Sequence, residues 1–449
     1  MKSMRSRLLI ALGATTLIAT ALSRQSQAAG GDVVIPDCSD CNFIIVTQDV
    51  LRATHTTPYG YERETTPAMG KAANRGLRFD KGYSPASWTV PSVCSLLSIS
   101  NVTDTGLFFN WDPTHESWNP ISKKVVTLGQ VLSKQGIESH VFVETDVLVD
   151  KLEIQRGFTS WEVYPHKSQP VDAVVQKLTD SKKRGKRFFA YVHYRGIHIP
   201  LKPPESYQSL FVDAPLPYGK AGFGKPKDDA SPEEAQNFIN AYDQTARWYD
   251  DALGSLLAGL AKADLTKKTY ILFTADHGTS LGEGQKGRYN YGPRAYDEVL
   301  HVPMVLVGPG IAAGSAFPKP VSQLDVAYTV LKAMGVNEGD APWRGVDLRE
   351  QVPSTVVSFA MGVESARNAT HRVDVSLDSG KATYFAIGAE DTPIPAEQVP
   401  QAAELLAAAK RVIADGRALN AATAAAAPAQ TIDLNASELE ALKALGYVE

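Results

Sequence analysis

Short apolar runs alternate with amphipathic stretches along most of the chain. Runs of four or five mostly β-branched or aromatic residues are typical of buried strands, and apolar residues at helical spacing are typical of helices. The predicted strands are residues 43–47, 140–143, 188–192, 270–274 and 304–307. The predicted helices are residues 67–75, 89–98, 125–134, 171–178, 231–262 and 326–334. Because strands and helices alternate over about 300 residues, we expect an α/β fold with a central, mostly parallel sheet flanked by helices.

The pattern changes near residue 351. Short apolar runs at residues 356–359 and 382–387 predict a small C-terminal antiparallel sheet. The Ala-rich stretch 402–426 predicts a helix or partial disorder, and residues 435–445 predict a last short helix that begins at an Asn cap. We therefore expect a main domain at residues 30–350 and a C-terminal subdomain with a helical tail at residues 351–449.

The first 29 residues have the pattern of a signal peptide. Lys2, Arg5 and Arg7 supply a positive start, residues 8–22 an apolar middle, and residues 26–29 a small-residue cleavage site. A membrane anchor is the alternative, but the apolar run is short for a span and is interrupted by threonines. The sequence therefore predicts a periplasmic or secreted protein with no membrane span after cleavage.

Composition agrees with a large exported domain. The chain has 449 residues, of which 44% are hydrophobic, and this is enough for a large core. A charged fraction of 21% and a net charge of −4 do not favour nucleic acid as a partner. Cys38 and Cys41 form a C-x-x-C sequence, which in an exported protein predicts a small disulfide loop. Cys94 lies in an apolar stretch and is expected to be a buried thiol.

Candidate chemistry gathers where predicted strands end. Asp49 follows the strand 43–47, and Asp276 with His277 follows the strand 270–274. The carboxyl ends of parallel strands are where sites form in open α/β sheets. Carboxylate oxygens with one imidazole nitrogen predict a divalent cation site. Thr89 lies on a turn before a predicted helix, where a metal could activate its hydroxyl as a nucleophile.

Basic side chains could neutralise an anionic ester and its transition state. The candidates are Arg52, His193, His198, Lys286, Arg288 and Arg294. Each feature alone has an ordinary explanation, since a Thr before a helix is more often an N-cap than a nucleophile. Their joint occurrence favours transfer or hydrolysis of a sulfate or phosphate ester.

Several motifs resemble the sulfatase family of the alkaline phosphatase superfamily. Residues 48–67 are similar to its opening motif and residues 88–97 to its nucleophile segment. Residues 193–200 resemble its central histidine motif and residues 242–253 the helix that follows. Residues 274–303 resemble its second metal motif, and residues 439–447 are similar to the tail of many members. The resemblance covers nearly the whole mature chain and implies a sulfatase-like catalytic domain at residues 30–350.

The resemblance also implies roles for particular residues. Asp49, Asp276 and His277 would bind one divalent cation, usually Ca²⁺ in this family, with Mn²⁺ or Zn²⁺ as alternatives. Thr89 would hold the attacking group, and His198 would contact the ester or its leaving group. The implied substrate is a small anionic ester, or a sulfated or phosphorylated glycan or lipid.

The positions that depart from the family pattern lie in the motifs expected to surround the ester, not in the segments that predict the fold. Sulfatases that carry formylglycine begin from C/S-x-P-x-R, whereas residues 89–93 read Thr-Val-Pro-Ser-Val, so no formylglycine is expected. Val50 follows Asp49 where many members have a second Asp. Gly284 and Tyr291 stand at positions that are usually His, and Gly196-Ile197 stands where the family has Asp-Pro.

Three hypotheses therefore remain open at this point. The first is a phosphoryl-ester hydrolase or transferase that uses unmodified Thr89, and the second is a divergent sulfatase. The third is a non-catalytic binding protein on a sulfatase scaffold. Retention of Asp49, Thr89, Asp276 and His277 favours catalysis over binding alone. We expect His55 and His193 to be structural rather than catalytic.

Overall fold

A computed structural model describes the greater part of the chain. It covers residues 33–107, 117–118, 120–145, 147–148, 150–219, 222–227, 229–283, 289–424 and 432–433. The predicted signal peptide and the predicted helix at 435–445 lie outside the described residues. No helix of the described part is long and apolar enough to cross a membrane.

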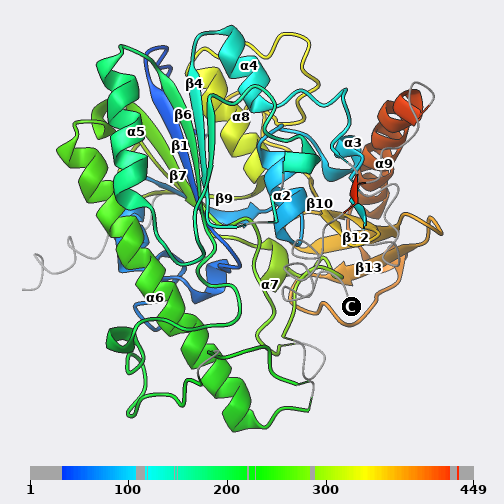
Figure 1. The fold of residues 1–449 in the computed structure, drawn as a ribbon. Coiled ribbons are helices and arrows are strands. Elements are labelled where there is room, and N and C mark those ends of the chain that lie inside the picture. Colours follow the sequence, from blue (N-terminus) through cyan, green and yellow to red (C-terminus); the bar gives the residue numbers. More distant parts are fainter. Residues whose placement is uncertain are drawn as a thin grey trace, which may run out of the picture.

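A large mixed sheet forms the centre of the molecule (Figure 1). Its eight strands have the spatial order β5-β4-β6-β1-β7-β8-β2-β9. All neighbouring pairs are parallel except the two that involve β8, so the predicted mostly parallel sheet is confirmed. The bounds are β1 Asn42–Gln48, β2 Leu77–Tyr83, β4 Glu138–Val143, β5 Ser160–Val163, β6 Phe188–Tyr194, β7 Thr269–Thr274, β8 Val305–Val307 and β9 Ser315–Ser322.

Helices cover both faces of this sheet. Figure 1 shows α5 and α6 on one face and α2, α4 and α8 on the other. The α-helices that precede the C-terminal strands in the described residues are α1 Pro67–Ala73, α2 Thr89–Leu96, α3 Val102–Thr105, α4 Leu128–Lys134, α5 Val171–Lys183, α6 Pro232–Lys262, α7 Asp297–Leu300 and α8 Gln323–Ala333. The central strands β1, β6 and β7 are buried along almost their whole length because helices cover them on both sides.

The long helix α6 begins where its sequence predicts. Ser231 is the N-cap, and its hydroxyl accepts a hydrogen bond from the main-chain N–H of Glu234 at 3.2 Å. The Glu234 carboxylate in turn accepts from the main-chain N–H of Ser231 at 2.8 Å, which completes a capping box. Pro232 occupies the first helical position, where its missing N–H costs nothing.

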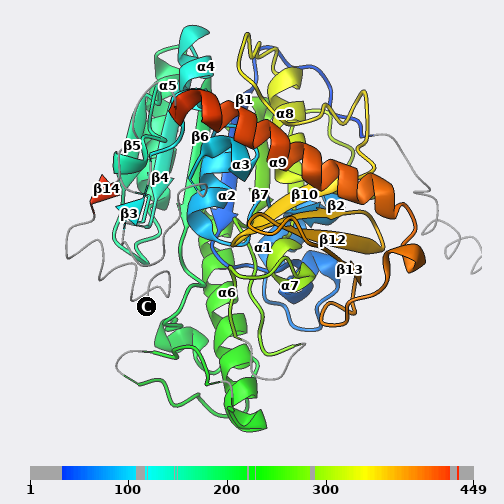
Figure 2. The same cartoon turned by 90° about the vertical axis from the view of Figure 1, so that its right-hand side faces the viewer.

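The C-terminal part forms a separate antiparallel sheet, as predicted. Strands β10 Val356–Ala360, β11 Val363–Arg367, β12 His371–Ser376 and β13 Ala382–Ala386 pair in sequence order. Figure 2 shows α9 (Ala402–Ala424) lying across this sheet and beside α3. A small core joins the helix to the sheet and includes Ala366, Val373, Leu405 and Ala409. Two short strands, β3 Ser117–Trp118 and β14 Ile432–Asp433, also pair antiparallel.

Some element boundaries differ from the predictions. The strand predicted at 188–192 continues to Tyr194, so His193 lies inside β6 rather than after it. The helix predicted at 125–134 begins only at Leu128, because Thr127 caps it. The helix predicted at 171–178 runs on to Lys183. The strands β2, β5, β9, β11 and β12 were absent from the prediction.

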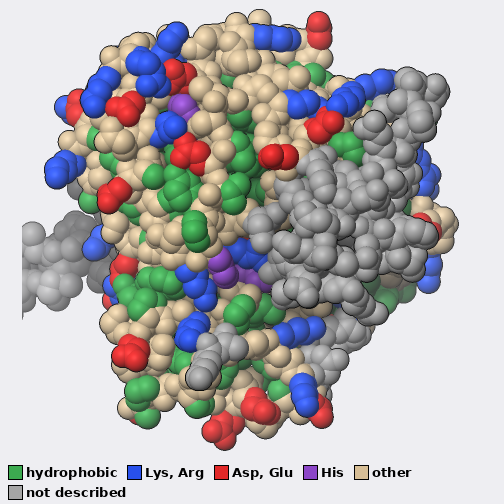
Figure 3. Space-filling view, viewed as in Figure 1, with side chains coloured by type: hydrophobic (Ala, Val, Ile, Leu, Met, Phe, Trp, Pro, Cys, Tyr) green, Lys and Arg blue, Asp and Glu red, His purple; other side chains and the backbone are tan. Residues whose placement is uncertain are grey.

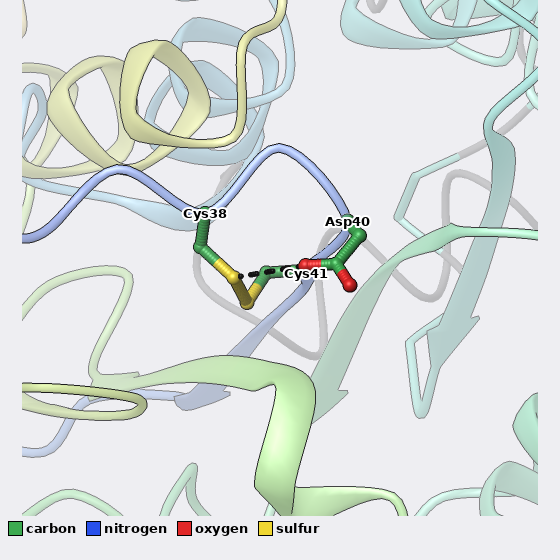
Figure 4. A group of neighbouring side chains, drawn as sticks. All are labelled: Cys38, Asp40 and Cys41. Carbon is green, nitrogen blue, oxygen red and sulfur yellow. Dashed lines mark hydrogen bonds between the residues drawn. A yellow bond between two sulfur atoms is a disulfide. The ribbon is translucent and has the colours of Figure 1, made fainter.

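The predicted disulfide loop precedes β1. Cys38 and Cys41 are joined, and Asp40 lies beside them with its Oδ1 atom 3.5 Å from the Cys38 sulfur (Figure 4). The main-chain N–H of Cys38 donates to the carbonyl of Ala333 at 2.7 Å, which fixes the loop to the end of α8. Cys94 is a buried free thiol, as expected.

Candidate metal and ester site

Two neighbouring strand ends bring the predicted ligands together. β1 and β7 are parallel and paired, with Thr47 opposite Thr274, so the residues that follow both strands lie side by side. Candidate ligand atoms of Asp49, Asp276 and His277 all lie within 4.8 Å of one another. These three side chains are at most 1% exposed. The predicted cluster is therefore present in the folded chain.

The ring of His277 is oriented as a ligand would be. Its Nδ1 lies 2.8 Å from the carbonyl oxygen of Gly278, which can only accept, so Nδ1 carries the hydrogen. Burial lowers the pKa of His277, which favours the neutral ring. The Nε2 lone pair then faces Oδ1 of Asp49 at 3.5 Å and Oδ2 of Asp276 at 3.7 Å. Three converging electron-pair donors suit a shared cation.

The two carboxylates interact strongly. Burial, followed by the nearby Asp276 carboxylate, raises the pKa of Asp49 well above its usual value. Although burial alone would raise it, the pKa of Asp276 is lowered because His277 and His193 face it. His193 reaches Asp276 from β6, with its Nε2 3.3 Å from Oδ2. Two buried carboxylates this close are costly, and a divalent cation would offset their repulsion.

Thr89 lies at the edge of this cluster. Its Oγ1 atom is 3.3 Å from Nε2 of His277 and 3.5 Å from Oδ1 of Asp49, and the residue is 1% exposed. It is the first residue of α2, whose N-cap is Trp88, so the hydroxyl does not serve as the N-cap of this helix. Ser92 donates to the main-chain carbonyl of Asp276 at 2.6 Å and thereby joins α2 to the end of β7.

The main chain after Asp49 is held in an unfavourable conformation. Val50 has a φ of 63°, a region that β-branched residues rarely adopt. Its N–H points to Oδ1 of Asp276 at 3.4 Å, and its carbonyl accepts from the hydroxyl of Tyr242 at 2.8 Å. Helix α6, through Tyr242, thus fixes the turn that directs Asp49 into the cluster.

His198 is linked to the cluster by Tyr291, a residue that the sequence analysis did not assign to the site. Its Nδ1 lies 2.7 Å from the carbonyl of Ile199, so its Nε2 accepts from the hydroxyl of Tyr291 at 2.7 Å. The ring of Tyr291 lies 4.6 Å from the ring of His277, centroid to centroid. Burial lowers the pKa of His198 far below its usual value and favours the neutral ring. Tyr291 could have been suspected only because it stands where His is usual.

The predicted basic residues have different surroundings. Arg52 is buried, and its guanidinium forms an ion pair with Glu283 at 2.7 Å. Arg294 is exposed and lies over the ring of Tyr296, 5.5 Å from its centroid. Lys286 and Arg288 lie outside the described residues.

A further basic residue escaped the prediction. Arg195 directly follows β6, is 4% exposed and donates to Oγ1 of Thr145 at 2.6 Å. Its charge contributes, after burial, to the low pKa of His198. Histidine side chains with Lys or Arg side chains beside them are visible near the centre of the face in Figure 3. The only signal in the sequence was a basic residue three positions after the end of the strand predicted at residues 188–192.

A family model of sulfatases matches residues 41–336, about two thirds of the sequence. The chain belongs to the sulfatase family. Membership supports a hydrolase of sulfate or phosphate esters, and sulfatases generally depend on a metal. The matched residues include the two strand ends, Thr89 and His198.

The chain is similar to a curated relative and to two solved structures, among others. The choline-sulfatase of Rhizobium meliloti (strain 1021) is 31% identical over 159 residues, which are 35% of this chain and 30% of that protein. A solved structure in complex with its substrate D-glucosamine-2-N,6-O-disulfate has a TM-score of 0.66 and 16% identity, with 85% of this chain and 98% of that chain covered. The phosphonate monoester hydrolase of Silicibacter pomeroyi has a TM-score of 0.61 and 19% identity, covering 85% and 96%. At these identities, both structures support the alkaline-phosphatase-like fold alone.

One departure from the sulfatase pattern has a visible physical reason. A Cβ atom added at Gly196 would lie 1.8 Å from the ring of Tyr249, a buried residue of α6. The space that an Asp would need at this position is therefore filled by an aromatic ring. Tyr249 also donates to Oε2 of Glu144 at 3.1 Å, so the ring is held on both sides.

Proposed function

We propose that this chain is an exported, metal-dependent hydrolase of sulfate or phosphate esters in which Thr89 is the nucleophile. The observation that carries the proposal is the position of the Thr89 hydroxyl, 3.3 Å from His277 and 3.5 Å from Asp49. A hydroxyl on the edge of a buried ligand cluster is where a metal-activated nucleophile would lie. Family membership supports the same class of reaction.

Asp49, Asp276 and His277 are the residues that would hold the cation. The family resemblance implies Ca²⁺, and the imidazole nitrogen in the set equally suits Mn²⁺ or Zn²⁺. A bound cation would polarise the ester oxygen and lower the pKa of the hydroxyl. Three protein ligands would leave further coordination positions for the ester.

In the proposed reaction, different residues supply the nucleophile, accept its proton and contact the leaving group. Oγ1 of Thr89 forms a bond to sulfur or phosphorus while the bond to the leaving oxygen breaks. Oδ1 of Asp49, 3.5 Å away, is placed to take the hydroxyl proton. Water then cleaves the Thr89 ester and restores the hydroxyl. We assign His198, with its partner Tyr291, to the side of the leaving group.

We further propose a periplasmic or secreted location, with residues 30–350 as the catalytic domain and residues 351–449 as a C-terminal subdomain. The N-terminal pattern and the Cys38–Cys41 disulfide support export. The proposed substrate is a small anionic ester or a sulfated or phosphorylated glycan or lipid. Two similar proteins support this range, since one is named a choline-sulfatase and the other was solved in complex with its substrate D-glucosamine-2-N,6-O-disulfate.

A substrate panel tests the proposal. The purified mature chain, loaded separately with Ca²⁺, Mn²⁺ or Zn²⁺, would be assayed with aryl sulfates, phosphate monoesters, phosphate diesters and phosphonate monoesters. We expect metal-dependent turnover of at least one class, lost on chelation and restored by the same metal. Sulfate turnover would identify a divergent sulfatase, and diester or phosphonate turnover a phosphoryl-ester hydrolase. No turnover with retained binding of the esters would leave a binding protein.

A further inference from the structure

A cavity of about 310 Å³ lies next to the proposed ester site. Its lining includes Lys225, Ser280, Asn290, Tyr291, Arg294 and Tyr296. This volume is at the lower end of the range for small-molecule sites and suits one ring with its substituents.

Tyr291 forms a wall between the cavity and the ligand cluster. Its hydroxyl donates to His198 at 2.7 Å, and its ring lies 4.6 Å from that of His277. A molecule held against Tyr291 on the cavity side would therefore be adjacent to the leaving-group side of the ester site. The position suits the part of a substrate that carries the ester.

The walls of the cavity are aromatic and its charges are positive. Tyr296 is buried, and its hydroxyl donates to Asp391 at 2.5 Å, which fixes its ring. Arg294 lies over that ring at 5.5 Å and remains exposed, as does Lys225. Arg372 also lies over the Tyr296 ring, at 5.3 Å, so Tyr296 holds Arg294 in place while the ring of Tyr291 is left to pack against a substrate ring. The two exposed cations suit a negatively charged substituent.

Ser280 adds an independent sign of a ligand. The residue is 4% exposed, and its hydroxyl has no hydrogen-bond partner among the described residues. Its main-chain N–H donates to the carbonyl of Asn290 at 3.0 Å, so the two sides of the loop are joined at this point. A buried hydroxyl without a partner is unfavourable, and a polar group of a bound molecule would satisfy it.

We propose that this cavity is a subsite for the ring that carries the ester, and that Lys225 and Arg294 select rings with a second anionic group. The inference rests on the proposed ester hydrolase and narrows its substrates to multiply charged aryl or sugar esters. Ser280 would hydrogen-bond a polar substituent, while Tyr291 would pack against the ring and Tyr296 would hold Arg294 in position.

Calorimetric binding of stable probes separates this inference from catalysis. Phenylphosphonate and its three carboxyphenyl isomers would be titrated into the metal-loaded protein. We expect at least one carboxylated isomer to bind about fivefold more tightly than phenylphosphonate, the size of effect for one exposed charge pair. The double variant Lys225→Gln/Arg294→Gln should bring this ratio close to one. The control Lys183→Gln/Lys262→Gln, which removes two exposed charges from α5 and α6, should preserve it.

Ser280→Ala provides a second test. We expect weaker binding of the probes, by about threefold or more, with an unchanged melting temperature, because the hydroxyl has no hydrogen-bond partner among the residues that the structure describes. Equal binding of all four probes to the wild type, or an unchanged ratio in the Lys225/Arg294 variant, would overturn the subsite. Preferential binding without turnover of any ester would instead retain the subsite and reject the hydrolase.

Discussion

The hydroxyl oxygen of Thr89 lies 3.3 Å from Nε2 of His277, although 188 residues separate them in the sequence. The contact exists because α2 begins next to the carboxyl end of β7. The hydroxyl of Ser92 in α2 donates a hydrogen bond to the main-chain carbonyl of Asp276 and holds the helix there. Nε2 carries no hydrogen, since Nδ1 donates to Gly278. One hydroxyl and one bare imidazole nitrogen therefore face the same small space, together with the oxygens of Asp49 and Asp276.

Gly278→Ala should damage the cluster without touching a ligand. A Cβ atom at this position would lie 2.4 Å from the carbonyl oxygen of Glu298, so the main chain must shift. We expect a loss of about 1–3 kcal/mol in unfolding free energy and metal affinity at least tenfold weaker, because the carbonyl that orients His277 moves. Denaturant unfolding and metal titration measure the two effects. Gly254→Ala on α6, where the nearest atom is 3.4 Å away, is the control. It should leave the metal affinity unchanged and raise the unfolding free energy by about 0.5–1 kcal/mol, because Ala is favoured over Gly inside a helix.

Tyr291→Phe should distinguish the role of His198 in turnover from the role of the metal ligands in binding the cation. The variant keeps the ring beside His277 but removes the hydrogen bond to Nε2 of His198. We expect unchanged metal content, about 1–2 kcal/mol lower stability from the unsatisfied buried nitrogen, and turnover reduced about tenfold or more. Tyr289→Phe, which removes a hydroxyl nearby in the same loop, serves as control. Full activity in Tyr291→Phe would exclude the assigned role of the pair.

Asp49→Asn should stabilise the metal-free protein, although it removes one of the proposed metal ligands. In the metal-free protein the change removes one of two facing buried carboxylates, so we expect a higher melting temperature than in the wild type. Saturating metal should stabilise the wild type by about 2.7 kcal/mol at a hundred times its Kd, and the variant far less. Calorimetric melting with and without chelator measures both. The surface variant Asp340→Asn should behave as the wild type, and an equal metal effect in Asp49→Asn would argue against this ligand.

Glu138 gives the protein an acid-dependent part of its stability. Hydrogen bonds from Arg184 and then Ser181 lower the pKa of Glu138 to about 2, below the value of about 4.5 expected in the unfolded chain. The stabilisation is therefore complete above pH 4.5 and is lost as the pH falls from 4.5 toward 2. We expect about 1 kcal/mol, since half of the Arg184 side chain is exposed and screened by water. Glu138→Gln should flatten this part of the pH profile in denaturant unfolding, and parallel profiles would contradict it.

Strand ends and helix caps could be predicted because their signals are local. The runs that became β1 and β7 are continuous and largely apolar, and each is followed within two residues by a ligand that it positions. The start of α6 is encoded in four consecutive residues that form its capping box. These features depend on neighbours in the sequence, so the chain itself specifies them.

Other elements depend on partners far away in the sequence. β9 contains Pro318 and Pro320, which argue against a strand because proline cannot donate a main-chain hydrogen bond. The strand can form because it lies at the edge of the sheet and, among the described strands, pairs only with β2. The contact of Tyr291 with His198 and the pairing of Arg52 with Glu283 join residues 93 and 231 positions apart. Tertiary packing determines such partners, so no local sequence pattern predicts them.

The most direct test of the account compares wild type, Thr89→Ser and Thr89→Val at equal metal occupancy on the best substrate of the ester panel. Thr89→Val keeps the shape of the side chain and removes only the hydroxyl. We predict metal affinity within a factor of two in all three proteins, partial turnover in Thr89→Ser, and turnover at least a thousandfold lower in Thr89→Val. Turnover in Thr89→Val within tenfold of the wild type would contradict the account, because the hydroxyl beside His277 could not then be the nucleophile.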